Sequence, residues 1–311
     1  MPKEYRKDLH CRLEFVYDAL SRTGFLTSIF DNDWYQKISQ EIDRADLSHP
    51  FQSDSALMFF ELDHPLRGIP WFEEAQQLIE QGREKELDED RKFAIAMVGL
   101  DPLRTFLPIL DERLASYAKI SFKEDEVSKK LKELHDNRFK PDFRNHVFEL
   151  SVLGFFAKEG VLTDIEVPVG TEQSTVDGEI KLNGRPILVE VTFTSQEILS
   201  PGPGVRAVDV EPFVRQVTDK IKKKVADGRQ LALSRGDPSI LFIGRNSLGA
   251  DKVTSRWGIK ECFADPNFAK LSAVIVSDTW KLIGTEFYSG LKPEIPLSEG
   301  EIKALTRWFT S

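Results

Sequence analysis

Cysteine is scarce in this chain, and long apolar runs are missing. Two cysteines, Cys11 and Cys262, are too few for a disulfide framework or a cysteine zinc site. No stretch approaches the roughly 20 apolar residues that a membrane helix requires. The charged N-terminus MPKEYRKDLH does not lead into the apolar core of a signal peptide. We therefore expect a soluble cytoplasmic protein with no membrane partner.

An excess of basic residues is also missing. The chain holds 42 Lys and Arg against 51 Asp and Glu, a net charge of −9, which excludes a generally basic protein that coats nucleic acid. Residues 1–140 carry 21 basic and 28 acidic side chains, a net of −7, while residues 141–311 carry 21 and 23, a net of −2. The acidic first half suits a protein partner, and only local patches of the second half suit phosphate.

Several common enzyme motifs are missing as well. The chain contains no P-loop, no GxGxxG and no GxSxG, so nucleotide hydrolysis, dinucleotide binding and α/β-hydrolase chemistry have no support. Its five histidines are scattered without the spacing of metal ligands. The chemistry therefore has to be sought among the carboxylates.

The first part of the chain has the pattern of helices. Apolar residues recur at helical spacing in 13–24, which ends at Gly24, in two stretches of 71–100, and after Asp101-Pro102. A charged amphipathic helix with opposite-charge pairs on its exposed face follows at 124–139. We predict an all-helical N-terminal domain at 1–125 that recognises substrate or binds a partner.

The pattern changes at Asn145 to a mixture of helices and strands. An apolar helix at 145–160, with Asn145 as N-cap and Gly160 past its end, opens this part. The expected elements that follow are strands at 163–169, 175–182 and 185–193, a helix at 211–228, and buried strands at 239–244 and 271–278. Together they predict an α/β domain with a mixed sheet at 126–311.

Asn183-Gly184 predicts a two-residue hairpin turn, which fixes the register of the two strands beside it. Asp177 and Glu190 then lie directly opposite each other, with Cβ atoms roughly 4.5–5.5 Å apart. Like charges so placed destabilise a hairpin unless a cation lies between them, and paired carboxylates suit Mg²⁺. A β-bulge at Gly178 would separate the pair.

Two interpretations of these carboxylates stay open. Acidic pairs commonly lie on the solvent face of an edge hairpin, where they need no ligand. Glu190, however, interrupts the apolar run ILVEVTF, and a buried carboxylate without a partner is costly. Glu149 is the only charged residue between Asn145 and Lys158. It either complements the helix dipole or faces the sheet beside Asp177 and Glu190.

This order of residues and elements resembles the PD-(D/E)XK, restriction-endonuclease-like nuclease superfamily over residues 125–280. The resemblance implies an αβββαβ core and a Mg²⁺ site, with Mn²⁺ as the alternative metal. It implies that Asp177 and Glu190 bind the metal, together with the carbonyl of Val191, and that Glu149 completes the catalytic site.

The sequence departs from the family pattern at Thr192, where the family has a lysine. That lysine orients the attacking water and stabilises charge in the transition state, which a neutral threonine cannot do. In related nucleases a lysine from the following helix takes its place, so the resemblance points to Lys220, with Gln216 on the same face. Lys223 follows on that face, but a solvated basic face is the competing interpretation for Lys222 to Lys224. Arg206 is a weaker candidate for a phosphate contact.

We thus hold two functional hypotheses. The first is a Mg²⁺-dependent nuclease that hydrolyses phosphodiester bonds, with DNA expected as substrate ahead of RNA. The second is a catalytically inactive nuclease-fold protein that binds partners in a multiprotein defence or repair assembly. Asp177 and Glu190 favour the enzyme, whereas Thr192 favours the scaffold.

Overall fold

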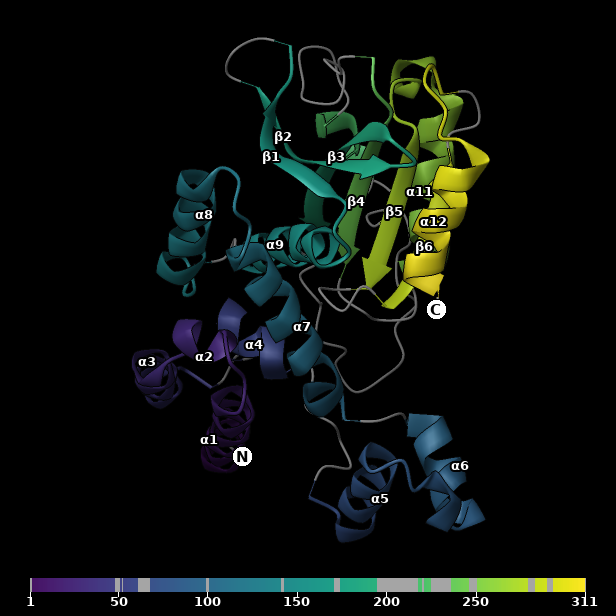
Figure 1. Ribbon diagram of the computed structural model, residues 1–311. Coiled ribbons are helices and arrows are strands. Elements are labelled where there is room, and N and C mark those ends of the chain that lie inside the picture. The colour runs from purple at the N-terminus through teal and green to yellow at the C-terminus, as the bar shows by residue number, and fades with distance from the viewer. Residues whose placement is uncertain are drawn as a thin grey trace. The chain divides into compact units, whose positions relative to one another are not determined.

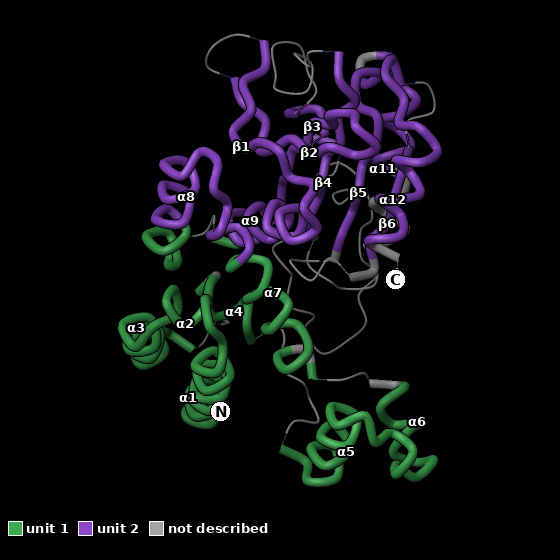
Figure 2. Tube along the Cα trace, in the orientation of Figure 1, with its two compact units in different colours: residues 1–115, 134–144 green, residues 116–133, 145–311 purple. Residues whose placement is uncertain are grey.

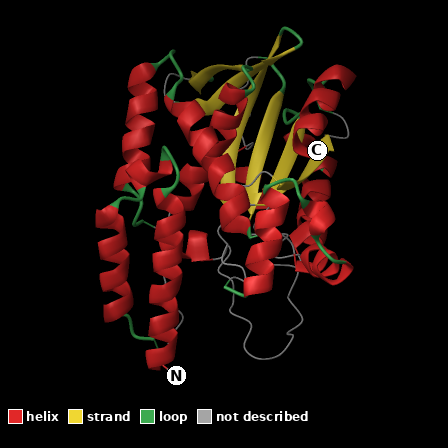
Figure 3. Cartoon of the chain, turned by 60° about the horizontal axis from the view of Figure 1, so that its bottom comes forward, coloured by secondary structure: helices red, strands yellow, loops and turns green. Residues whose placement is uncertain are grey.

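The chain forms helices first and an α/β region second (Figures 1 and 3), which confirms the predicted fold class. The computed structural model describes residues 2–47, 51, 53–60, 68–98, 101–140, 143–170, 174–194, 218–219, 221–224, 236–245, 251–278, 283–289 and 293–310. Within these residues no helix combines the length and the apolar character that crossing a membrane requires.

The chain divides into two compact units (Figure 2). Unit 1 comprises residues 1–115 and 134–144, and unit 2 comprises residues 116–133 and 145–311. The division expected between residues 125 and 126 thus falls inside the first segment of unit 2. The roles expected of the two parts stay predictions.

Unit 1 is helical throughout its described residues. Its elements are α1 Pro2–Ser21, α2 Leu26–Ile29, α3 Asn32–Arg44, α4 Asp54–Phe60, α5 Pro70–Glu80, η1 Glu84–Glu86, α6 Glu89–Val98 and most of α7 Pro102–Ala118. Phe30 packs edge-on against Trp34, Phe59 and Phe143 with ring centroids 4.8–5.6 Å apart. Edge-to-face aromatic packing adds to the burial of apolar area, so these rings form the centre of the core.

Two aspartates fix the starts of helices in unit 1. The Asp31 carboxylate accepts a hydrogen bond from the amide of Trp34 at 3.0 Å and so caps α3. Asp111 of α7 accepts from the amides of Gly24, Phe25 and Leu26 at the start of α2. α1 already ends at Ser21, so Gly24 is a capped loop residue and not the end of the first helix.

A six-stranded mixed sheet is the centre of unit 2. Its strands lie in chain order: β1 Leu162–Pro168, β2 Thr175–Leu182, β3 Arg185–Thr194, β4 Ser239–Arg245, β5 Ala273–Asp278 and β6 Ile283–Ser289. β1, β2 and β3 are antiparallel, β4 and β5 run parallel to β3, and β6 is antiparallel again. The first five strands match the predicted ones closely, whereas β6 is not among the sequence predictions.

The β2–β3 hairpin has the predicted turn and register. Asn183 and Gly184 both have positive φ, 51° and 83°, as a type I′ turn requires. The five paired positions run from Leu182–Arg185 to Gly178–Val189 without a shift, so the ladder is regular up to Gly178, where its paired positions end. An irregularity lies in β1 instead, between Leu162 and Asp164.

Helices cover both faces of the sheet in unit 2. On one face α9, Phe143–Lys158, packs Phe156 against Phe242 of β4 and against Trp308 of α12, Glu299–Thr310. On the other face α11, Asp251–Ala264, contributes Ile259 and Cys262 to a core with alternate residues of β3, β4 and β5. Both layers exclude water from the central strands, which explains their continuous apolar sequences.

α9 begins two residues earlier than the sequence predicts. Asn145 is therefore not its N-cap, and its Oδ1 accepts a hydrogen bond from the amide of Phe193 in β3 at 3.0 Å. Gly160 lies past the end of the helix, as predicted: α9 ends at Lys158, and Gly160, two residues later, has a φ of 70°. Asn145 thus ties α9 to the strand that carries Glu190.

Candidate metal centre

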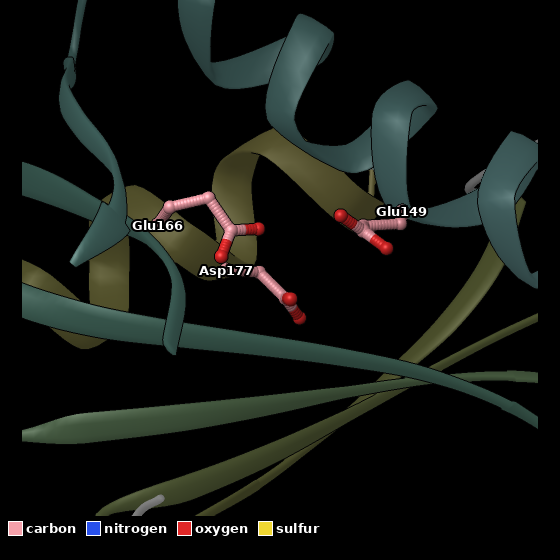
Figure 4. A group of neighbouring side chains, drawn as sticks. All are labelled: Glu149, Glu166 and Asp177. Atoms are coloured by element: carbon pink, nitrogen blue, oxygen red, sulfur yellow. The ribbon is translucent and has the colours of Figure 1, made fainter. Parts of the chain in front are cut away.

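Three carboxylates from three elements of unit 2 converge beside the sheet (Figure 4). They are Glu149 of α9, Glu166 of β1 and Asp177 of β2, and one oxygen of each lies within 4.8 Å of the others. Glu149 is buried, and Glu166 and Asp177 are half-buried. Oxygen ligands gathered at this spacing can hold a hard divalent cation.

A lysine from α8, Glu124–Asp136, reaches into this group. The ammonium of Lys130 forms ion pairs with Glu149 and Glu166, and the lysine side chain is only 17% exposed. Burial lowers the pKa of Lys130, but the carboxylates of Glu149, Asp177 and Glu166 raise it above its usual value on balance. The lysine is therefore charged at neutral pH.

Glu190 of β3 is a fourth acid near the group. Its side chain is fully buried, and its Oε1 accepts a hydrogen bond from the ammonium of Lys224. Its Oε2 is buried too and accepts no hydrogen bond from the part of the chain that the structure describes. An orphaned carboxylate oxygen of this kind is costly, and a bound cation would satisfy it.

Asp177 is held beside Glu190 by the backbone of β3. The amide of Val191 donates a hydrogen bond to Asp177 Oδ2 at 2.6 Å. The paired positions of β2 and β3 end at Gly178–Val189, one residue before Asp177 and Glu190, so the direct opposition of the two acids stays a prediction. One carboxylate oxygen of Asp177 also lies within 4.8 Å of an oxygen of Glu149 and of Glu166.

Asp177, Glu190 and Glu166 differ in how readily they ionise. Burial raises the pKa of Asp177 well above its usual range, and the charges of Glu190 and Glu149 raise it further. Burial also raises the pKa of Glu190, although Lys224 opposes this effect. The pKa of Glu166 is lowered, because Lys130 and Thr175 outweigh its burial. Lys224 thus offsets the burial of Glu190 only in part, and Asp177 has no ion pair among the described residues.

The carboxylates of the site outnumber the ammonium groups beside them. Four carboxylates stand against the ammonium groups of Lys130 and Lys224, which leaves a formal charge of −2 when all six groups are ionised. One divalent cation would neutralise this remainder in a region of low dielectric. The residues present therefore fit a metal such as Mg²⁺ or Mn²⁺.

The structure brings together three of the predicted site residues. Glu149 and Asp177 belong to the carboxylate group, and both interact electrostatically with Glu190. Val191 contributes its backbone amide, which donates a hydrogen bond to the Asp177 carboxylate. The expected ligand role of its carbonyl stays a prediction. Gln216, Lys220 and Arg206 lie outside the described residues.

Three charged residues of the site escaped the sequence analysis. Lys224 was expected on a solvated face, which is wrong, because it pairs with buried Glu190, whereas Lys222 and Lys223 are exposed. Lys130 stands in a helix whose charges have the ordinary spacing of surface pairs. Glu166 occupies the polar position between buried Ile165 and Val167 in β1, as in any alternating strand, so no local signal marked it. Its φ of 46° is seen only in the structure.

Comparison with family models, curated proteins and solved structures gave no match to this chain. The resemblance to the PD-(D/E)XK superfamily therefore rests on the residues and the fold alone. What stands is a mixed six-stranded sheet with a buried acidic group that can hold a metal ion.

Proposed function

We propose that this protein is a metal-dependent nuclease that hydrolyses phosphodiester bonds. The observation that carries the proposal is the convergence of three carboxylates, beside a fourth, Glu190 of the motif strand β3, whose carboxylate is paired with Lys224. A divalent cation held there would polarise a phosphate oxygen and supply a nucleophilic water near neutral pH. The remaining steps belong to side chains of the chain itself.

We assign to Lys224 the role of the family's motif lysine, which Thr192 replaces in this chain. Thr192 is buried and neutral, while the ammonium of Lys224 reaches Glu190 two positions earlier on the same strand. In that position Lys224 would donate hydrogen bonds to a phosphate oxygen that gains charge in the transition state. Asp177 and Glu190 would hold the metal, and Glu149 and Glu166 would complete its oxygen environment.

A cleavage assay with isosteric variants tests the proposal. Wild type, Asp177→Asn and Glu190→Gln are incubated with DNA and RNA of mixed sequence, in Mg²⁺ or Mn²⁺ and in EDTA. Cutting should require metal and fall at least about a hundredfold in both variants, the usual effect of losing one electrostatic contact in the transition state. We expect DNA to be cut ahead of RNA.

Glu179→Gln provides the matched control. Glu179 lies two residues from Asp177 on β2, but its carboxylate accepts a hydrogen bond from Thr163 and belongs outside the acidic group. This variant should cut as wild type does. Cutting that persists in Asp177→Asn and Glu190→Gln would refute the assignment.

The second candidate function is that of a non-catalytic binding protein in a multiprotein assembly. The neutral, buried Thr192 favours it, because the motif strand itself supplies no cation. In that case the two lysines would serve as structural partners of the acids. Wild type would then cut neither nucleic acid in any metal, while affinity purification would recover a stable protein partner.

A further inference from the structure

Lys130 contacts the oxygen atoms that a metal would need. Its ammonium pairs with Oε1 of Glu149 and Oε1 of Glu166, and these two acids form the metal-competent group with Asp177. The three side chains are 10–29% exposed, so little water separates the charges. The ammonium therefore stands where a cation bound to this group would stand.

Lys130 and a divalent cation at this position exclude each other. A Mg²⁺ ion would lie about 2.1 Å from each ligand oxygen, which brings it within a few ångströms of an ammonium bound to the same carboxylates. Positive charges at that distance repel strongly where water is scarce. The unsatisfied Oε2 of buried Glu190 is a separate sign that the resident ammonium groups leave the acids short of positive charge.

We propose that Lys130 is a built-in counter-ion of the carboxylate group, which a divalent cation displaces when it binds. The inference rests on the metal site of the proposed function, but not on hydrolysis. The flexible four-carbon stem of lysine lets the ammonium withdraw while α8 stays in place. Metal-free protein keeps its acids together through Lys130, and metal-bound protein holds them through the ion.

Metal affinity of the full chain tests this competition. Mn²⁺ binding is measured by calorimetry for wild type, Lys130→Gln and Lys132→Gln. Lys132 is exposed on the same helix, so its variant has the same change in net charge without touching the acids. Lys130→Gln should bind Mn²⁺ at least about tenfold more tightly, because no ammonium has to leave. Lys132→Gln should bind as wild type does.

Equal or weaker binding by Lys130→Gln would overturn the inference while leaving the metal site intact. Absence of Mn²⁺ binding in every variant would overturn the metal site as well. A measurement on wild type keeps the test decisive if Lys130→Gln fails to fold. Acetylation of single lysines by an acylating reagent is followed by mass spectrometry, with and without Mn²⁺.

Displacement predicts that Mn²⁺ exposes the amine of Lys130. Its acetylation should become several times faster when metal is added, whereas that of Lys132 should stay constant. An unchanged rate at Lys130 under conditions where calorimetry shows bound Mn²⁺ would overturn the inference.

Discussion

Single residues decide the charge balance of the candidate site. Lys224 compensates one oxygen of Glu190, and Lys130 compensates Glu149 and Glu166. Asp177 receives a backbone amide but has no ion pair among the described residues. The loss of any one of these groups therefore leaves a specific partner uncompensated, and its effect on stability can be predicted separately from catalysis.

Lys224→Met should lower the free energy of unfolding by about 3 kcal/mol or more, because it leaves the fully buried Glu190 without its cation. Adding Glu190→Gln to this variant should restore much of the loss, since the charge that needed compensation is then gone. Urea denaturation in EDTA measures both effects. Lys223→Met, at an exposed position, should change stability by less than about 0.5 kcal/mol. Additive effects in the double variant would contradict the pairing.

Asp177 should make the metal-free protein less stable as pH rises. Its folded-state pKa is raised above the unfolded value by burial and by Glu190 and Glu149, so its protonated form is favoured in the fold. Its stability contribution is complete below the unfolded pKa of about 3.9 and is lost as pH rises through the raised folded pKa. Asp177→Asn avoids this loss.

The advantage of Asp177→Asn over wild type in EDTA should therefore grow with pH across that window. It should reach roughly 1.4 kcal/mol for each unit by which the folded pKa exceeds the unfolded one. Denaturation at a series of pH values measures it. If the free energies of unfolding of the two proteins depended on pH in the same way, the Asp177 carboxyl would titrate alike in the folded and unfolded chains, which would contradict the prediction.

At the scale of elements, the close approach of α9 to β2 sets the distance between Glu149 and Asp177. A Cβ placed on Gly178 would lie 2.7 Å from Leu153 Cδ2, so either the buried Leu153 side chain or its helix would have to shift. A glycine inside a strand marks either a bulge or the close approach of another element. Gly178 pairs regularly with Val189, so the close approach of the helix explains it. The residue next to Asp177 thus determines how near α9 can come.

Gly178→Ala should destabilise the protein by about 1–3 kcal/mol through overpacking and should weaken Mn²⁺ binding, because α9 and Glu149 are pushed outward. Leu153→Val removes the Cδ2 atom that the new methyl group would strike. The double variant should therefore recover part of both losses. Thermal unfolding and calorimetry measure the two quantities, and a Gly178→Ala protein as stable as wild type would contradict the packing argument.

At the scale of the whole molecule, every described member of the acidic site lies in unit 2. A ligand that binds only the folded state stabilises the cooperative unit that holds it. We therefore expect Mn²⁺ to slow hydrogen exchange in 116–133 and 145–194 and to leave exchange in 1–115 nearly unchanged.

Hydrogen exchange followed by mass spectrometry, with Mn²⁺ and with EDTA, checks this expectation. Asp177→Asn should show little metal-dependent protection in either unit. Equal protection of both units by Mn²⁺ would mean that they unfold together. Protection confined to unit 1 would place the metal elsewhere.

What the sequence could predict follows from how far each signal reaches along the chain. Asn183-Gly184 fixed the register of β2 and β3 because a two-residue turn constrains the strands directly beside it. Lys130 and Lys224 were missed because their acids lie 19 and 34 residues away, beyond any local pattern. A lysine in a helical charge pattern looks the same whether it meets solvent or a buried glutamate.

The two units are interleaved along the chain, since the boundary is crossed at 115, 133 and 144. No single truncation separates them. A protein that starts at residue 145 would keep the whole sheet but would lose Lys130, the cation that is paired with the carboxylates of both Glu149 and Glu166. Without Lys130 the acids of the shortened protein would depend on a bound metal ion for positive charge. We expect it to stay in solution in a buffer that contains Mn²⁺ and to precipitate in EDTA, so the choice of buffer would decide whether it is recovered.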